Sequence, residues 1–223
     1  IYGNDFLVAK EAKEIANTYG AHDVLEGNKT VFDSSNFDMS QFQQVSQALP
    51  FMDSVRLLVL EDVIKNNTSI GTSIIQHLPH LPESTLLIIK EHSDKINSSM
   101  SKASAKELTV KNLVGPKSNR ELHQWIKEQT LNKNLPISPS GITALAHNVG
   151  VNLWSIDNEL EKLSLYTQGR QITDVEVKEL VHASEEINLF GTIDAIIEKK
   201  RGTAFHNISA LLTEGHDTNS ILR

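Results

Sequence analysis

The sequence contains no cysteine, and this absence removes several kinds of chemistry. Without thiols the chain forms no disulfide, holds no metal through thiolates and has no cysteine nucleophile. The absence fits a reducing cytoplasm, which is the location we expect. No hydrophobic run approaches the roughly 20 residues that a membrane span needs, and no signal-peptide pattern is visible, so we expect no membrane partner.

Basic residues are also fewer than acidic ones. The chain has 21 lysines and arginines against 28 aspartates and glutamates, which gives a net charge of −7. A protein that binds DNA without partners usually has an excess of Lys and Arg residues or a stripe of them on its surface. Any contact with nucleic acid is therefore expected to be local or shared with partner subunits.

A phosphate-binding loop is missing as well. The first strand ends at Ile1–Tyr2, and residues 2–7 then read Tyr-Gly-Asn-Asp-Phe-Leu, with one glycine and no Gly-Lys-Ser/Thr. Wrapping a triphosphate requires backbone N–H groups of a glycine-rich turn and a lysine. Glu61 and Asp62 follow a hydrophobic strand, where nucleotide-driven motors keep their magnesium carboxylates, but without phosphate ligands we interpret them as a solvated strand end. The sequence thus predicts no nucleotide cofactor.

Other catalytic or metal-binding patterns are weak. His77 and His80 flank Pro79 with no nearby third donor, so we predict no metal site. No serine lies in a Gly-x-Ser-x-Gly elbow, and we expect no catalytic residue. Trp125 is predicted to be core, whereas Trp154 lies beside the apolar stripe of its helix and is a candidate for a domain or subunit contact.

What the first half does contain is an alternation of strand and helix patterns. Strands separated by helices predict βαβ units and a mainly parallel sheet. The predicted strands are Ile1–Tyr2, Lys29–Phe32, Val55–Leu60, Thr85–Lys90 and Leu108–Leu113. The predicted helices are Asp5–Tyr19, Asn36–Leu49, Ile70–Leu78 and Asp94–Ala105.

After Gly115-Pro116 only helical patterns remain. Capping boxes begin at Ser118 and Thr173, and Pro139 takes a first helical position. Further helices are predicted around Leu153–Leu163, Asn188–Lys200 and Thr203–Glu214. We therefore divide the chain into an α/β domain (1–116), a small helical domain (117–184) and the start of a further helical domain (185–223). Since the chain begins at Ile1 and stops within an apolar pattern, we expect it to be a fragment of a longer protein.

The stretch from Gln47 to Asp62 is the most informative. It joins the end of an amphipathic helix, at Leu49 and Pro50, to a central strand that is apolar on both faces. Between them lie Phe51 and Met52, two large apolar residues in a connection that normally holds polar groups. On these residues alone, the pair either packs beneath the sheet or forms an exposed anchor for a partner.

Several segments together resemble the delta subunits of bacterial DNA polymerase III, a component of the clamp loader. Each segment is weak alone, but their order and spacing are fairly specific, and the resemblance runs over essentially the whole chain. The segments are Ile1–Leu7, Glu11-Ala12, Ala48–Met52, Arg56–Leu60, Glu121–Lys127, Asn158–Tyr166, Ile172-Thr173 and Asn188–Ala195.

The resemblance implies an AAA+/RecA-like domain, a helical lid domain and the start of a helical collar domain, without ATP hydrolysis. It implies that the protein binds and helps open the ring-shaped sliding clamp (beta subunit) for loading onto primed DNA. It also implies a hetero-pentamer with gamma/tau and delta prime subunits, and contact with primer–template DNA only within that assembly. The clamp-binding residues would be Phe51 and Met52, with Leu49 and Pro50 shaping the approach. Some relatives have Leu-Phe at the pair.

Two alternatives remain. One is an ATP-binding, gamma/tau-like clamp-loader subunit, against which the missing phosphate loop counts. The other is a small-molecule α/β enzyme that uses the carboxyl edge of the sheet as its pocket. Such an enzyme would need a cluster of titratable groups at the strand ends, and Glu61-Asp62 alone is too little.

Overall fold

A computed structural model of the 223-residue chain describes residues 1–20, 26–65, 67–95, 100, 108–182, 195–197 and 199–213. The chain divides into two compact units, Ile1–Gly115 and Pro116–Arg223. None of the helices in these ranges is long and apolar enough to cross a membrane. Each unit is described separately below.

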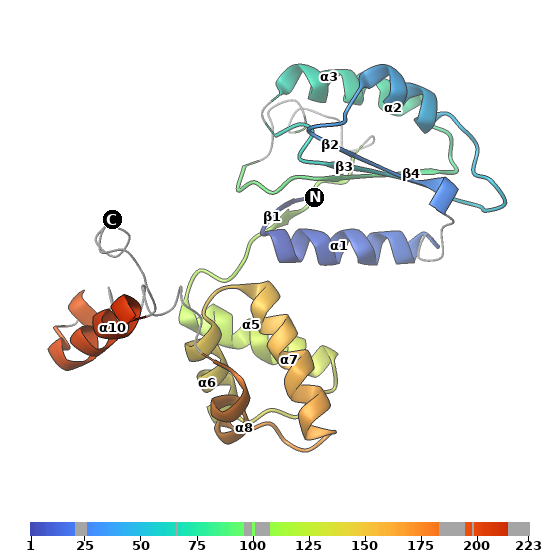
Figure 1. Cartoon of the computed structure of the whole chain (residues 1–223). Coiled ribbons are helices and arrows are strands. Elements are labelled where there is room, and N and C mark those ends of the chain that lie inside the picture. Colours follow the sequence, from blue (N-terminus) through green and yellow to red (C-terminus); the bar gives the residue numbers. More distant parts are fainter. Residues whose placement is uncertain are drawn as a thin grey trace. The chain divides into compact units, whose positions relative to one another are not determined.

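The first unit is built on short parallel strands (Figure 1). Parallel pairing joins β2 to β3 and β3 to β4, and separately joins β1 to β5. A parallel bridge between Tyr2 and Glu91 connects β1 to the residue after β4, which gives the order β2-β3-β4-β1-β5. The strands are β1 (Tyr2–Gly3), β2 (Lys29–Asp33), β3 (Arg56–Glu61), β4 (Thr85–Lys90) and β5 (Asn112–Leu113).

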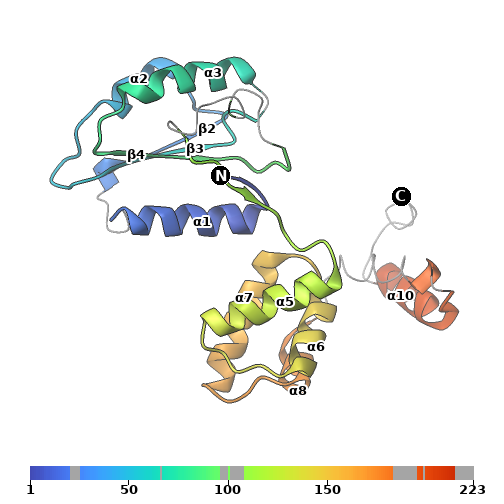
Figure 2. The same ribbon diagram turned by 180° about the vertical axis from the view of Figure 1, so that it is seen from behind.

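Helices cover both faces of this sheet, as Figures 1 and 2 show from opposite sides. Successive residues of β3 alternate between the two faces. Leu58 and Leu60 pack toward a cluster with α2 and α3, whereas Leu57 and Val59 pack toward α1. Because both faces are covered, β3 is buried throughout its centre, as its apolar run predicts. The α-helices are α1 (Asp5–Thr18), α2 (Met39–Ser46) and α3 (Thr68–His77), with short 3₁₀ turns η1 (Glu26–Asn28) and η2 (Leu78–His80).

Polar caps set where these helices begin. The side chains of Asn4, Asp38 and Asn67 each accept a hydrogen bond from an N–H group of the first turn. Gly3 has a φ of 128°, and a Cβ there would lie 2.2 Å from the carbonyl oxygen of Leu113. Only glycine therefore allows β1 to pair this closely with β5.

The second unit is helical in its described part. Its core is formed by the apolar stripes of α6 and α7, which the sequence predicts at spacings of three and four. The helices are α5 (Asn119–Asn132), α6 (Pro139–Val149), α7 (Leu153–Thr167), α8 (Asp174–Leu180) and α10 (Arg201–Thr213). A single parallel bridge joins Ile137 to Ile172.

Capping differs between the two predicted capping boxes. At Thr173, the backbone N–H donates to the Glu176 carboxylate at 2.9 Å, so the box is complete. At Ser118, the hydroxyl caps the N–H of Glu121, but the Glu121 carboxylate accepts from the N–H of Lys117 instead of Ser118. The second contact is thus shifted by one residue along the chain.

The predicted α/β class with a parallel sheet is confirmed, and element boundaries account for most of the differences. The predicted helix 36–49 ends at Ser46, and the predicted strand 108–113 is reduced to Asn112–Leu113. The predicted helices 94–105 and 188–200 fall mostly outside the described residues, and the predicted 203–214 helix corresponds to α10. The division at residues 184–185 stays a prediction.

Candidate functional site

Residues Leu49–Met52, here called the wedge segment, carry the largest exposed apolar side chains of the α2–β3 connection. Leu49 is 76% exposed, Phe51 68% and Met52 84%, while Pro50 is partly buried. The pair Phe51 and Met52 therefore does not pack beneath the sheet. Three large apolar side chains within four residues form a local patch of the kind that marks interaction sites.

A buried asparagine fixes the backbone of this patch. The side-chain amide of Asn28 donates to the Phe51 carbonyl at 2.7 Å, and its oxygen accepts from the Phe51 N–H at 2.6 Å. Asn28 is fully buried at the end of η1, directly before β2. One amide thus satisfies both backbone groups of Phe51, much as a neighbouring strand would, and leaves the phenyl ring facing solvent.

The end of α2 is anchored by a second buried polar contact. Ser46, the last residue of α2, places its hydroxyl 2.8 Å from Nε2 of His77, and its carbonyl accepts from the hydroxyl of Thr85 at 3.1 Å. Burial lowers the pKa of His77, and the neighbouring His80 lowers it further. His77 is therefore held in its neutral form at physiological pH, where one ring nitrogen donates and the other accepts.

The other end of the connection leads directly into the sheet. The N–H of Arg56 donates to the carbonyl of Ser84 at 2.8 Å, and β3 begins at this residue. Met52 has a φ of 52°, in the left-handed region that non-glycine residues rarely adopt. Such conformations cost about 1–3 kcal/mol and persist where the surroundings enforce them, often at functional sites. The wedge segment is thus held on both sides.

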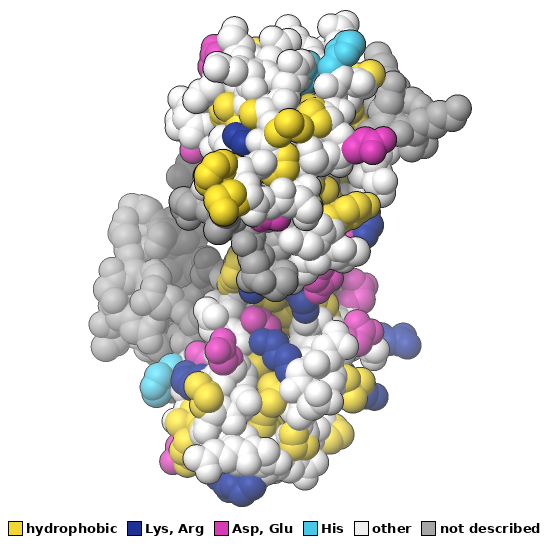
Figure 3. All heavy atoms as spheres, turned by 90° about the vertical axis from the view of Figure 1, so that its right-hand side faces the viewer, with side chains coloured by type: hydrophobic (Ala, Val, Ile, Leu, Met, Phe, Trp, Pro, Cys, Tyr) yellow, Lys and Arg dark blue, Asp and Glu magenta, His cyan; other side chains and the backbone are white. Residues whose placement is uncertain are grey.

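The wedge segment lies at the edge of the sheet where the parallel strands begin. In Figure 1 the α2–β3 connection passes the end of the sheet next to η1. Figure 3 faces this end of the α/β unit and shows hydrophobic side chains exposed on it. A partner protein could approach this edge without meeting the opposite, carboxyl edge.

The carboxyl edge holds a cluster of charged groups that pair with one another. Glu61 and Lys90 form an ion pair at 2.8 Å, and the Asp62 carboxylate lies 2.8 Å from Nδ1 of His92. Burial on its own would raise the pKa of Asp62, but hydrogen bonds from the His92 ring and backbone outweigh it and lower the pKa. The sequence predicts a solvated strand end at Glu61 and Asp62, whereas in the structure each of these side chains contacts a basic partner. Both carboxylates, of Glu61 and of Asp62, are therefore engaged with partners inside the protein.

Glu91, next to this cluster, is a buried carboxyl group whose hydrogen bonds are incomplete. Its Oε1 accepts from the N–H of Ile64 at 3.0 Å, while its buried Oε2 has no hydrogen-bond partner among the described residues. Burial raises the pKa of Glu91, and the backbone hydrogen bond from Ile64 only partly offsets this. One lone carboxyl group with a raised pKa does not make an active site.

In the first turn, where a phosphate loop would lie, the N–H groups donate hydrogen bonds to oxygen atoms of the protein itself. Gly3 donates to the carbonyl of Glu91 at 3.3 Å, and Asn4 donates to that of Leu113 at 2.8 Å. The N–H of Leu7 is capped by the Asn4 side chain at 3.3 Å. These donors are therefore not directed at a phosphate position.

The histidine and tryptophan expectations have separate outcomes. Within the described ranges, no group of three or more His, Asp and Glu side chains could hold a metal ion, and His77 is engaged with Ser46. Trp125 is partly buried, so it contributes to the helical unit without being fully core. Trp154 is 50% exposed, and its assignment to a domain or subunit contact stays a prediction.

With this geometry in place, comparison with known proteins assigns the family. The family model described as "DNA polymerase III, delta subunit" matches residues 1–114, which include the whole wedge segment. The chain belongs to the DNA polymerase III delta subunit family. The resemblance seen in the sequence is thus confirmed at the level of the family.

Two curated relatives align with the entire delta-family chain. DNA polymerase III subunit delta of Escherichia coli (strain K12) is 22% identical over 228 aligned residues, and that of Bacillus subtilis (strain 168) is 25% identical over 242. The alignments cover 66% and 67% of those proteins. The chain therefore spans about two thirds of the length of these curated relatives.

Solved structures support the fold of this delta-family chain. The Bacillus subtilis DNA clamp loader delta protein superimposes with a TM-score of 0.69 at 20% identity, over 99% of this chain and 68% of that one. The Thermotoga maritima RuvB Holliday junction branch migration motor superimposes with a TM-score of 0.52 at 13% identity, over 90% of this chain and 68% of that one. At these identities the matches show the fold, and they confirm the predicted AAA+-like architecture.

Sequence reasoning located the wedge segment but missed the residues that hold it. Asn28 is remote in sequence from Phe51, and nothing in the Glu-Gly-Asn turn before β2 indicates a buried amide. The sequence likewise assigns Ser46 no role, and it offers His77 only as a weak metal-ligand candidate, not as a partner of Ser46. Position is the only signal that could have suggested such contacts. Asn28 directly precedes a strand, and Ser46 and His77 directly precede the connections that follow their helices.

Proposed function

We propose that this chain is the clamp-binding part of a clamp-loader delta subunit. In this role it binds the ring-shaped sliding clamp and helps open it for loading onto primed DNA during replication. The wedge segment Leu49–Met52 inserts into an apolar pocket on the clamp, with Phe51 and Met52 as the anchors. The relatives, DNA polymerase III subunit delta and DNA clamp loader delta protein, support the role.

The observation that carries the proposal is the anchored exposure of the wedge segment. Phe51 and Met52 are both more than half exposed, yet the backbone beneath them is fixed by Asn28 and the flanking elements by Ser46 and Arg56. Large apolar anchors held on rigid elements bind with a small ordering cost. Aromatic and methionine side chains are also favoured at protein interfaces.

The remaining features support a subunit that acts without its own nucleotide chemistry. The first-turn N–H groups of Gly3 and Asn4 donate to backbone carbonyls, and the acidic balance disfavours DNA binding by the chain alone. We propose that the other partners are the gamma/tau and delta prime subunits in a hetero-pentamer. Primer–template DNA is contacted within that assembly, which acts in the cytoplasm.

The test is the double substitution Phe51→Ala with Met52→Ala. Each substitution removes about 1.5–3 kcal/mol of the binding free energy that burial of the side chain at the clamp supplies. At about 1.4 kcal/mol per tenfold change, affinity for the cognate sliding clamp should fall by roughly two to four orders of magnitude. Because both side chains are exposed in the free chain, the free energy of unfolding should change by less than about 0.5 kcal/mol. Calorimetry and urea unfolding measure the two quantities.

A matched control removes two other apolar side chains that are also more than half exposed. Leu165 and Val175, 72% and 64% exposed, lie on α7 and α8 of the helical unit. Their double alanine variant should bind the clamp like the parent. Unchanged clamp binding in the wedge variant would refute the assignment, and unfolding of that variant would show that Phe51 and Met52 are structural.

A further inference from the structure

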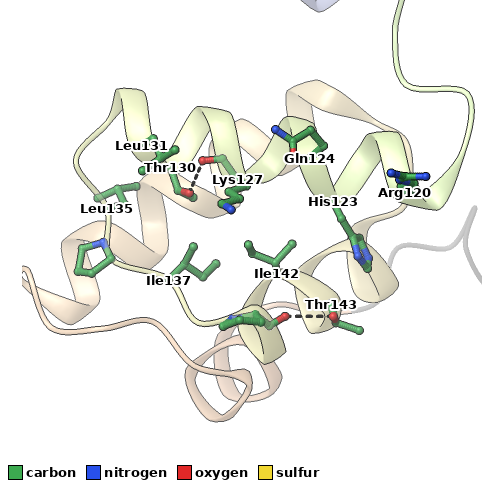
Figure 4. A pocket seen from close by; sticks show the side chains of 12 residues that line it. Arg120, His123, Gln124, Lys127, Thr130, Leu131, Leu135, Ile137, Ile142 and Thr143 are labelled. Carbon is green, nitrogen blue, oxygen red and sulfur yellow. Dashed lines mark hydrogen bonds between the residues drawn. The ribbon is translucent and has the colours of Figure 1, made fainter.

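A groove between α5 and α6 of the helical unit is not used by the proposed clamp binding. Its volume is about 650 Å³, within the range of protein binding sites. None of its lining residues is acidic, although acidic residues outnumber basic ones in the chain. Figure 4 shows the groove from close by, with side chains of α5 on one side and those of the α5–α6 connection and α6 on the other.

One wall of the groove is cationic. Arg120, His123 and Lys127 follow one another on α5 at spacings of three and four, so they share one face of the helix. In Figure 4 Lys127 extends from α5 toward the space between Ile137 and Ile142. Neither Arg120 nor Lys127 forms an ion pair with another described residue.

The acidic residues of α5 do not neutralise this wall. The carboxylate of Glu121 accepts from the N–H of Lys117 and the hydroxyl of Ser118, and that of Glu128 accepts from the amide of Gln124 at 2.8 Å. Neither glutamate lines the groove. The two permanent charges therefore face an open, acid-free space.

The far end of the groove is apolar. Leu131, 65% exposed, follows Lys127 by one turn of α5, and Ile137 and Ile142 form the opposite wall. From Arg120 to Leu131 the helix rises about 16 Å at 1.5 Å per residue. An extended peptide covers that length with about five residues. The groove thus has a cationic end and an apolar end within reach of one short segment.

These features favour a peptide over a nucleic acid. No Phe, Tyr or Trp side chain lines the groove, so apart from the small ring of His123 bases have no aromatic surface on which to stack. The net charge of −7 opposes a long polyanion, whereas a short peptide experiences mainly the local cations. An apolar end also has no counterpart on a sugar–phosphate chain.

We propose that the α5–α6 groove binds a short acidic–apolar peptide segment of a partner protein. Its carboxylates pair with Arg120 and Lys127 and accept a hydrogen bond from His123, and its apolar side chains cover Leu131 and Ile137. This surface lies on the helical unit, and its occupation does not depend on the wedge segment or on clamp binding.

The test measures fluorescence anisotropy of labelled, acetylated pentapeptides with the 223-residue chain. Each probe combines two adjacent Asp or Glu residues with three Leu, Ile or Met residues, in either order. Probes with Asn or Gln in place of the acids should bind at least tenfold more weakly. K127E should weaken binding of the acidic probes at least tenfold, and L131S should weaken it severalfold. K13E is the matched control, since Lys13 is exposed on α1 of the other unit, and it should leave binding within twofold.

Circular dichroism checks that each variant is folded, and L131S still tests the groove if K127E is not. Absence of binding by every acidic probe at millimolar concentration overturns the proposal. Binding that neither K127E nor L131S weakens places the site elsewhere and overturns it too. Pentathymidylate that binds more tightly than the peptides and is lost in K127E would identify the groove as a nucleic-acid site instead.

Discussion

At the scale of single residues, Asn28 is the most consequential position of the α/β unit. A side-chain amide has one acceptor and two donors, and Asn28 uses both functions on the same residue, Phe51. Because Asn28 is fully buried, these hydrogen bonds compete with little water. The position of the wedge backbone therefore depends on a residue that cannot itself touch a partner.

Asn28→Ala should weaken clamp binding without removing either anchor. Leaving the Phe51 N–H and carbonyl without partners should lower the free energy of unfolding by about 1–3 kcal/mol. Clamp affinity should fall by roughly tenfold, since the loosened loop must be ordered on binding. Urea unfolding and calorimetry with the clamp measure both.

Two variants distinguish positioning from general loss of stability. Asn28→Asp keeps the acceptor for the Phe51 N–H but sets an oxygen against the Phe51 carbonyl, so an intermediate clamp affinity is expected. Ile74→Val removes one buried methyl group on α3, at a typical cost of about 0.5–1.5 kcal/mol, and should bind the clamp like the parent. Equal loss of affinity in Ile74→Val would argue against a positioning role for Asn28.

Glu91 should make the α/β unit less stable as pH rises. Burial raises the pKa of Glu91 in the folded chain, so the folded state holds its proton more tightly than the unfolded state. Stability from this proton is fully present below the unfolded pKa and is lost as pH rises through the folded pKa. Glu91→Gln should therefore gain stability relative to the parent as pH rises above the ordinary carboxyl pKa of 4.5. Urea unfolding at a series of pH values measures this difference, and a difference that does not change with pH would contradict it.

At the scale of elements, the connection between α2 and β3 shows why boundaries are hard to predict. The apolar spacing of Phe42, Val45 and Leu49 extends a helix to Leu49, but the helix ends at Ser46. Pro50 has no N–H to donate to the Ser46 carbonyl four residues earlier, and that carbonyl accepts from the Thr85 hydroxyl instead, a contact about which periodicity contains no information. Leu49 is consequently exposed and joins the wedge segment.

The central strands were predictable because burial on both faces leaves a simple sequence pattern. Val55–Leu60 and Thr85–Lys90 were placed within one residue of β3 and β4. The first turn was also predictable, since its missing glycines and lysine are visible directly. The contact of the Asn28 amide and the pairs of the carboxyl edge were not, because each joins residues 23 to 30 positions apart.

Gly3→Ala should break the pairing of β1 with β5. A Cβ at this position would lie 2.2 Å from the Leu113 carbonyl oxygen, and the φ of 128° is strained for any other residue. We expect a loss of more than about 2 kcal/mol in the free energy of unfolding, since the obstructing atom belongs to the backbone. Gly27→Ala, which meets nothing within 4 Å, is the control and should stay within about 0.5 kcal/mol of the parent. Urea unfolding compares the two, and equal stability would show that the β1–β5 pairing adapts.

At the scale of the whole molecule, the chain combines an α/β unit that carries the wedge segment with a helical unit that carries the α5–α6 groove. The family model covers the first of these units almost entirely, so family membership rests mainly on the part that holds the wedge segment. The helical unit is less constrained by that match, and its groove offers a separate recognition surface.

The chain should not bind Mg-ATP. The N–H groups of Gly3 and Asn4 are already engaged with backbone carbonyls, and residues 2–7 contain no lysine to pair with a phosphate. Calorimetric titration should be flat at millimolar nucleotide, with an ATP-binding subunit of a clamp loader as the positive control. A micromolar binding isotherm would revive the alternative of a gamma/tau-like subunit.

The contact between Asn28 and Phe51 uses only backbone atoms of Phe51. The place at which the side chain of residue 51 emerges therefore does not depend on which side chain it is. Any residue except proline offers the same N–H and carbonyl, so the side chain at this position can change while its attachment point stays fixed. Residues 47–55 are bounded by Ser46 and Arg56, each tied to the sheet independently of them. Surface residues of this connection can thus be exchanged without any adjustment of the core that supports it.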